Sequence, residues 1–270
     1  MAAPAAGSPD KIVDRLRAAG CVFAEEEAAL LREAAATPAE LERLLVARVT
    51  GVPLEQLLGW ADFCGLRIAV EPGVFVPRQR SALMVCEAAR LLVPGDVVVD
   101  LCCGSGAVGA AVLTAVPGVE LHAADIAPAA VRCARRNLPT AQVHQGDLFD
   151  ALPRRLRGRV KVITCNAPYV PSAAVASLPP EARDHEPRAS LDGGPDGLAV
   201  VARVLGQATP WLAASGSLLV EVAEHQVAAA VARAAGAGLW PRVVRREETA
   251  SIVLAASPAG RHVSGRSSRV

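Results

Sequence analysis

The chain has 270 residues, of which 52% are hydrophobic and 20% charged, and its formal net charge is +1. A chain of this length and apolar content can bury one substantial core and add a second small domain. Its balanced charge disfavours nucleic acid, a polyanion or a membrane surface as a partner, and its aromatic content of 3% is too low for a base-stacking platform.

Signals for export and for metal binding are weak in this sequence. The first nine residues have no charged start followed by an apolar core, and the longest apolar runs are short, so we expect no signal peptide and no membrane span. Seven cysteines occur without a Cys-x-x-Cys pattern, which disfavours a zinc site and a disulfide framework. We therefore expect no bound metal and a reducing, cytoplasmic compartment.

The first 59 residues are predicted to form a small helical domain. Apolar residues recur at helical spacing in three segments, which start near Ile12, Ala28 and Pro38. Thr37 precedes the third segment and Glu40 lies just inside it, which is an N-cap followed by proline at the first helical position. Such a bundle could serve packing alone or provide a platform for a protein partner.

Residues 60–79 are predicted to be a β-hairpin linker. Two extended runs, 62–70 and 74–76, flank Glu71-Pro72-Gly73, and a Pro-Gly pair between such runs favours a hairpin turn. A helix over 80–92 then opens the largest predicted domain, residues 80–257, and a polar, basic and flexible tail is predicted over 258–270.

Strands alternate with helices through this largest domain. The predicted strands are 97–101, 119–124, 142–145, 160–165, 217–222, 242–246 and 251–256, and the helices between them are 106–115, 128–137, 197–213 and 226–235. This alternation implies an α/β fold with a mainly parallel sheet and right-handed crossovers. The last two strands are too close for a helix between them, so they should form a hairpin and place the last strand antiparallel at or near the sheet edge.

A glycine-rich turn follows the first of these strands. Residues 97–101 run into Cys102-Cys103-Gly104-Ser105-Gly106, and glycine lets the backbone approach a ligand closely. Residues 104–109 also fit the dinucleotide pattern, with Asp125 at roughly the expected distance for a ribose contact. A nicotinamide dinucleotide and S-adenosylmethionine therefore compete for this loop.

Three aspartates favour S-adenosylmethionine. Asp100 precedes the turn, where a carboxylate would repel a pyrophosphate but suit an ammonium or sulfonium cation. Asp125 could accept from both ribose hydroxyls, and Asp147 from the adenine amino group. Any one aspartate could simply cap a helix, but three consecutive strands that end in one predict a binding site. The predicted cofactor-binding residues are Asp100, Cys102, Cys103, Gly104, Ser105, Gly106, Asp125, Ile126, Asp147, Leu148 and Asn166, with Ile126 and Leu148 flanking the adenine ring.

The fourth strand ends in Asn166-Ala167-Pro168-Tyr169, and with this motif the chain resembles class I S-adenosylmethionine-dependent methyltransferases that carry an Asn-Pro-Pro-Tyr loop. Among them it is similar to the protein-(glutamine-N5) methyltransferases that modify peptide chain release factors. The resemblance covers nearly the whole chain: the helical N-terminal region and residues 53–59, 63–78, 100–106, 166–169, 186–194 and 196–198. It implies a Rossmann-like sheet, a helical substrate-recognition domain, S-adenosylhomocysteine as product and a protein substrate that presents a glutamine loop.

The target implied by this resemblance suggests a mechanism. A glutamine amide nitrogen is a poor nucleophile because its lone pair is delocalised into the carbonyl. The Asn166 side-chain oxygen and the Ala167 carbonyl could hold both N–H groups and draw the nitrogen toward tetrahedral geometry, while Tyr169 packs against the amide and Pro168 fixes the turn. Catalysis would then come from positioning and preorganised dipoles, with no general base assigned.

Two segments depart from the family pattern. Ala167 stands where the family usually has the first proline of its loop, which the chemistry tolerates because it uses a backbone carbonyl. Gln79-Arg80-Ser81 replaces what is usually proline, an acidic residue and threonine, which leaves open a related branch with a different target.

Other readings also stay open at this point. One alternative function is methylation of an exocyclic amine in a nucleic acid, which the neutral charge disfavours, and another is a nicotinamide-dependent oxidoreductase. Asp184-His185-Glu186 looks like part of a catalytic triad, although its predicted loop position favours a structural or substrate-contact role. Glu221, at a strand end, could line the site or act as a cap.

Overall fold

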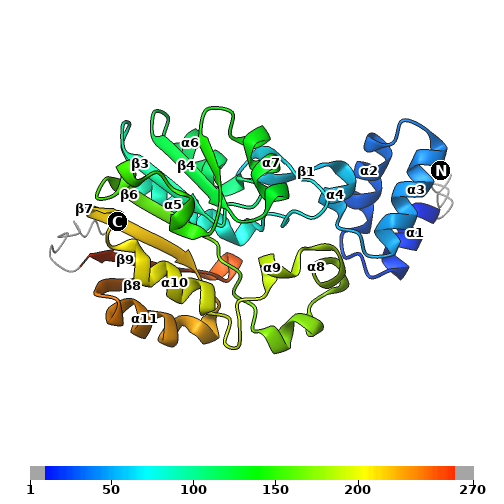
Figure 1. Ribbon diagram of the computed structural model, residues 1–270. Coiled ribbons are helices and arrows are strands. Elements are labelled where there is room, and N and C mark those ends of the chain that lie inside the picture. Colours follow the sequence, from blue (N-terminus) through cyan, green and yellow to red (C-terminus); the bar gives the residue numbers. More distant parts are fainter. Residues whose placement is uncertain (1–9, 259–270) are drawn as a thin grey trace, which may run out of the picture.

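The amino-terminal part of the protein is a bundle of four helices (Figure 1), seen in a computed structural model that describes residues 10–258. The helices are α1 Lys11–Ala18, α2 Ala24–Ala34, α3 Pro38–Val49 and α4 Leu54–Leu58. Leu16, Leu31 and Leu45 are buried at its centre. The predicted cap is confirmed, since Oγ1 of Thr37 accepts from the Glu40 amide at 3.1 Å. Helix α4 was not predicted, because five residues are too few to show a helical period.

The turn of the β-hairpin lies closer to the amino terminus than the sequence suggested. Strands β1 Trp60–Phe63 and β2 Leu66–Ala69 pair antiparallel around Cys64 and Gly65, whose φ angles are 52° and 75°. Two positive φ values match the twist of the flanking strands. A turn does form at Pro72-Gly73, where the Val74 amide donates to the Glu71 carbonyl at 3.1 Å, but it joins no paired strands, so the predicted hairpin around it was wrong. The backbone amide of Val76 instead donates to Glu186 Oε1 at 3.0 Å, which takes this residue out of any strand ladder.

A seven-stranded sheet forms the centre of the larger part, in the order β5-β4-β3-β6-β7-β9-β8. The strands are β3 Val97–Leu101, β4 Glu120–Asp125, β5 Gln142–Gln145, β6 Val160–Cys165, β7 Leu212–Glu221, β8 Leu239–Arg246 and β9 Ser251–Pro258. Strands β3 to β7 are parallel, and β9 is antiparallel to both of its neighbours. The predicted α/β fold with an antiparallel last strand is confirmed.

Helices cover both faces of this sheet (Figure 1). One face packs against α5 Ala82–Leu91, α6 Ala107–Ala115 and α7 Pro128–Asn137, and the other against α10 Ala199–Ala208 and α11 Val227–Gly236. Along β3, Val97, Val99 and Leu101 are buried on the second face and Val98 on the first, as a period of two requires. Helix α10 ends before Pro210, so the prediction that it reached residue 213 was wrong.

The segment between β6 and α10 joins the bundle to the sheet. It contains η4 Ser172–Ser177, α8 Pro180–His185 and α9 Arg188–Leu191, and Figure 1 shows α8 beside the bundle. Nη1 of Arg48 on α3 lies 2.5 Å from Glu181 Oε1, and Nε2 of Gln56 donates to the carbonyl of His185 at 3.5 Å. The helical bundle is therefore tied to the loop that precedes α10.

Two predictions concern chain ends and membranes. Pro258, the first residue of the predicted tail, is the last residue of β9, and residues 259–270 lie outside the described part of the chain, as do residues 1–9. Within residues 10–258, no helix combines the length and the apolar character needed to cross a membrane.

Candidate active site

A cavity of about 430 Å³ lies at the carboxyl ends of the parallel strands. The loops after β3, β4, β5 and β6 all contribute to it, because parallel strands bring their carboxyl ends to the same edge of the sheet. The predicted site residues that line it are Asp100, Cys102, Cys103, Gly104, Ser105, Asp125, Ile126, Asp147, Leu148, Asn166, Ala167, Pro168 and Tyr169. The folded chain thus brings the predicted catalytic residues and every predicted cofactor residue except Gly106 into one space.

The glycine turn contributes bare backbone to this cavity. A Cβ atom built on Gly104 would meet no protein atom within 4 Å, so the backbone there borders open space. Gly106 has a different role. It lies outside the cavity lining, and a Cβ atom there would be 2.8 Å from Leu138 Cδ1. Its φ of 81° and its contact with Leu138 make it a packing residue at the start of α6.

Asp100 is a buried carboxylate with two hydrogen-bond donors. Thr164 Oγ1 donates to Oδ1 at 2.7 Å, and the backbone amide of Gly109 donates to Oδ2 at 3.2 Å. Burial raises the pKa of Asp100 to about 7, against these two hydrogen bonds. Burial penalises the charged form of Asp100. A cation that entered the cavity would offset this penalty by attraction and stabilise the ionised carboxylate.

The other two aspartates lie farther along the same edge of the sheet. Asp125 accepts from the backbone amides of Gly104 and Ala127, each at 2.9 Å, and burial raises the pKa of this carboxyl against those hydrogen bonds. Each of its oxygens keeps a second lone pair for a ligand hydroxyl. Asp147 forms an ion pair with Arg203, whose Nη2 lies 2.6 Å from Oδ2. Arg203 on α10 lines the cavity as well, and no sequence pattern predicted this position.

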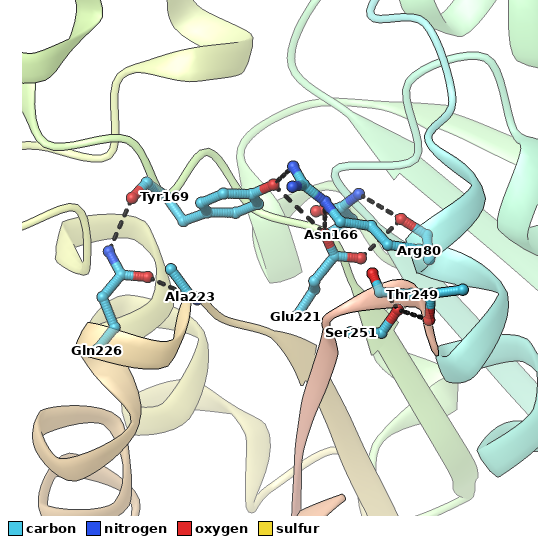
Figure 2. Close-up of polar contacts among 9 residues, drawn as sticks. Arg80, Asn166, Tyr169, Glu221, Ala223, Gln226, Thr249 and Ser251 are labelled. Carbon is cyan, nitrogen blue, oxygen red and sulfur yellow. Dashed lines mark hydrogen bonds and ion pairs between the residues drawn. The ribbon is translucent and has the colours of Figure 1, made fainter. Parts of the chain in front are cut away.

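The loop formed by Asn166, Ala167, Pro168 and Tyr169 is held from two sides (Figure 2). Nδ2 of Asn166 donates to Ser81 Oγ at 3.1 Å, and Oδ1 of Asn166 has no partner among the described residues. On the other side, Gln226 Nε2 donates to the Tyr169 carbonyl at 2.7 Å. The loop therefore presents an unused amide oxygen next to a fixed backbone.

The segment after the hairpin also lines the cavity, through residues 73–75, 77 and 78. Arg78 donates from Nη2 to both carboxylate oxygens of Glu186 at 2.8 Å, and Val76 donates to the same carboxylate through its backbone amide. Burial raises the pKa of Glu186, and the Arg78 charge opposes this shift. The two residues lie 108 positions apart, and the only sequence signal for their contact was that both belong to motifs of the resembled family.

His185 is not part of a catalytic triad. Asp184 pairs with Arg183 at 2.8 Å, and the His185 ring faces Gly51 of the bundle instead of the cavity. The sequence favoured a structural or a substrate-contact role for His185, and the position of its ring against the bundle fits the structural one.

The sheet defines the class of protein. Numbered within the sheet, its strands follow the order 3-2-1-4-5-7-6, whereas the dinucleotide-binding fold has the order 3-2-1-4-5-6. The antiparallel strand β9 between β7 and β8 makes this a class I methyltransferase fold. A solved methyltransferase from Pyrococcus furiosus shares it, with a TM-score of 0.54 and 17% identity over 71% of this chain and 88% of that one.

Comparisons with known proteins identify the family. The model of the methyltransferase small domain matches residues 65–178. The release factor glutamine methyltransferase of Thermosynechococcus vestitus is 32% identical, over 71% of this chain and 69% of that protein. The enzyme of the same name from Mycolicibacterium smegmatis is 38% identical, over 68% and 66%. The chain belongs to the release factor glutamine methyltransferase family, and the nicotinamide-dependent alternative was wrong.

Two further facts bear on how far this likeness extends. The chain spans just under two thirds of the length of the first curated relatives it matches, for example 66% and 63%. A 4-amino-L-phenylalanine/4-methylamino-L-phenylalanine methyltransferase from Streptomyces pristinaespiralis is 35% identical, over 74% of this chain and 70% of that protein. Enzymes with different named acceptors are therefore similar to this chain.

Proposed function

We propose that this chain transfers a methyl group from S-adenosylmethionine to the side-chain amide nitrogen of a glutamine in a protein, either a peptide chain release factor or a related protein. One observation carries the proposal: a single cavity is lined by the three strand-end aspartates, by the bare backbone of Gly104 and by the Asn166–Tyr169 loop with its unused amide oxygen.

The residues at the glycine turn fit S-adenosylmethionine. Asp100 supplies a negative charge for a cationic group, and Asp125 and Asp147 keep oxygens for hydroxyl and amino donors. Leu148 is nearly buried and Ile126 is 62% exposed, so together they offer apolar surface for the adenine ring. When bound, the cofactor supplies an electrophilic methyl group on a sulfonium.

The Asn166–Tyr169 loop is proposed to activate the acceptor. Asn166 Oδ1 and the Ala167 carbonyl accept the two N–H groups of the glutamine amide and favour a tetrahedral nitrogen whose lone pair is available. The Tyr169 ring packs against the amide plane, and Pro168 shapes the turn. Because Gln226 and Ser81 already hold this loop, little reorganisation is needed when the acceptor enters, and such preorganisation contributes several kcal/mol.

The helical bundle is proposed to recognise the substrate protein. It is attached to the α8–α9 segment through Arg48 and Gln56, and Pro187, Ser190 and Leu191 of that segment line the cavity. A protein loop that rests on the bundle would thus reach the cavity along a continuous surface.

A second candidate acceptor is the amine of a free amino acid. A relative named for 4-amino-L-phenylalanine is 35% identical, and the side chains of Arg78 and Arg80, 35% and 44% exposed, line the cavity. Their remaining N–H donors could bind the carboxylate of such a substrate.

The test uses the purified chain with S-adenosylmethionine labelled in its methyl group. Full-length release factor and 4-amino-L-phenylalanine are offered in parallel, and mass spectrometry locates the label. We expect the label on a glutamine of the release factor. Label on the free amino acid alone would support the second candidate, and label only in added RNA or DNA would overturn both.

A further inference from the structure

A buried carboxylate, that of Glu221, lies beside Asn166 (Figure 2). Glu221, the last residue of β7, is 3% exposed, and three donors converge on it. Ser81 Oγ donates at 2.6 Å, Arg80 Nε at 3.0 Å and the Tyr169 hydroxyl at 3.4 Å. The strand register explains its position, because Cys165 of β6 is paired with Val220 of β7, so the residues that follow them are neighbours.

The chemistry of these groups fixes the direction of each hydrogen bond. A carboxylate only accepts, so the Ser81 hydroxyl must use its single proton on Glu221. Only lone pairs then remain on Ser81 Oγ for the contact with Asn166, so the amide group must turn its NH₂ toward Ser81. The Asn166 oxygen is thereby directed away from Ser81 and stays available, whereas a free serine hydroxyl could equally well donate to that oxygen.

The charge of Arg80 favours the ionised form of the Glu221 carboxylate. Burial raises the pKa of Glu221, and the hydrogen bonds from Ser81 and Arg80 together with the Arg80 charge oppose that shift. The Arg80 guanidinium also contacts the Tyr169 hydroxyl and lies 5.3 Å from the centre of its ring. Arginine, in place of the acidic residue usual in the family, therefore supports a carboxylate that only accepts.

We propose that Ser81 and Glu221 are positioning residues, which hold the Asn166 amide with its oxygen toward the acceptor nitrogen. The inference rests on the proposed methyl transfer and adds to it two residues, 81 and 221, that are separated by 140 positions in the chain. It also explains the departure at Ser81, since serine keeps the hydroxyl that threonine would supply.

Steady-state kinetics of three variants test this role. Ser81→Ala should lower kcat about 10- to 100-fold, less than direct removal of a stabilising group, with KM for both substrates within about twofold of wild type. Ser81→Thr should recover kcat to within about threefold. Glu221→Gln should lower kcat like Ser81→Ala. The NH₂ group of a glutamine only donates, so it cannot replace the carboxylate oxygen that accepts from Ser81 or the one that accepts from Arg80. Glu224→Gln, at an exposed position nearby with its own ion pair to Arg245, is the matched control and should leave kcat unchanged.

A second measurement is independent of the acceptor. The side-chain NH₂ protons of Asn166, observed by NMR in the ¹⁵N-labelled full chain, should exchange slowly in wild type and Ser81→Thr and at least about tenfold faster in Ser81→Ala.

The outcomes separate the two proposals. If wild type methylates no glutamine, the proposed function fails, and the exchange experiment alone decides the positioning role. Active wild type with unchanged kcat in folded Ser81→Ala overturns the positioning role, as does a threonine variant no faster than the alanine variant. Equal exchange rates in wild type and Ser81→Ala also overturn it.

Discussion

We expect S-adenosylmethionine to bind more tightly as the pH rises from 6 to 8, because Asp100 must be ionised to stabilise a cation. Burial raises the pKa of Asp100 to about 7 in the free protein. The carboxyl group is then about 9% ionised at pH 6 and about 91% ionised at pH 8. A nearby cation lowers this pKa, so the affinity follows the ionised fraction of the free protein. The sign is therefore an increase with pH, of about tenfold or about 1.4 kcal/mol.

The matched variant is Asp100→Asn, which the structure can accommodate. The asparagine oxygen can still accept from the Gly109 amide, and its NH₂ can donate to Thr164 Oγ1, which has the Val99 carbonyl as another acceptor at 3.5 Å. The variant should stay folded, bind more weakly at pH 8 and lose this component of the pH dependence.

Calorimetric titration of both proteins at several pH values measures the effect. The amino group of the ligand titrates in a similar range, but the protonation of the free ligand is common to both proteins and cancels in the ratio of their dissociation constants. That ratio should change about tenfold between pH 6 and 8. A ratio independent of pH, or one that changes in the opposite direction, would show that Asp100 does not face the cation.

Three further predictions concern the loop, its support and the bundle. Asn166→Ala should lower kcat by about 10²- to 10³-fold and leave the calorimetric affinity for S-adenosylmethionine within about threefold; normal turnover would refute the proposed mechanism. Gly197→Ala should abolish methyl transfer and lower the free energy of unfolding, because φ of Gly197 is +75° and a Cβ there would overlap the Tyr169 carbonyl. The control is Gly206→Ala, which adds a methyl group in open space on α10. It should raise the free energy of unfolding by about 0.5–1 kcal/mol in urea. Arg48→Ala should lower the free energy of unfolding by about 3–5 kcal/mol, since it leaves Glu27, with a side chain 12% exposed, without its partner. The double variant Glu27→Gln/Arg48→Met should recover most of this loss in the same urea experiment. Equal losses in the single and the double variant would contradict the reasoning.

Much of the fold could be predicted from local patterns. The bounds of β3, β5, β6 and α7 agree with the structure, because each is a short run with a glycine, proline or polar residue at one of its ends. The hairpin turn could not be located in the same way. Pro72-Gly73 is the stronger local turn signal and does form a turn, but the turn between the paired strands lies at Cys64-Gly65, where the pairing requires two positive φ angles.

The sequence by itself determined that Asp100, Asp125, Asp147 and Asn166 would meet, because strands that run parallel place their carboxyl ends on one edge of the sheet. Only the tertiary structure decided which other side chains complete the site. Ser81 and Glu221 are 140 positions apart, and Asp147 and Arg203 are 56 apart. Local periodicity does not predict such pairs, since burial, charge pairing and the direction of a hydrogen bond exist only once distant segments have packed together.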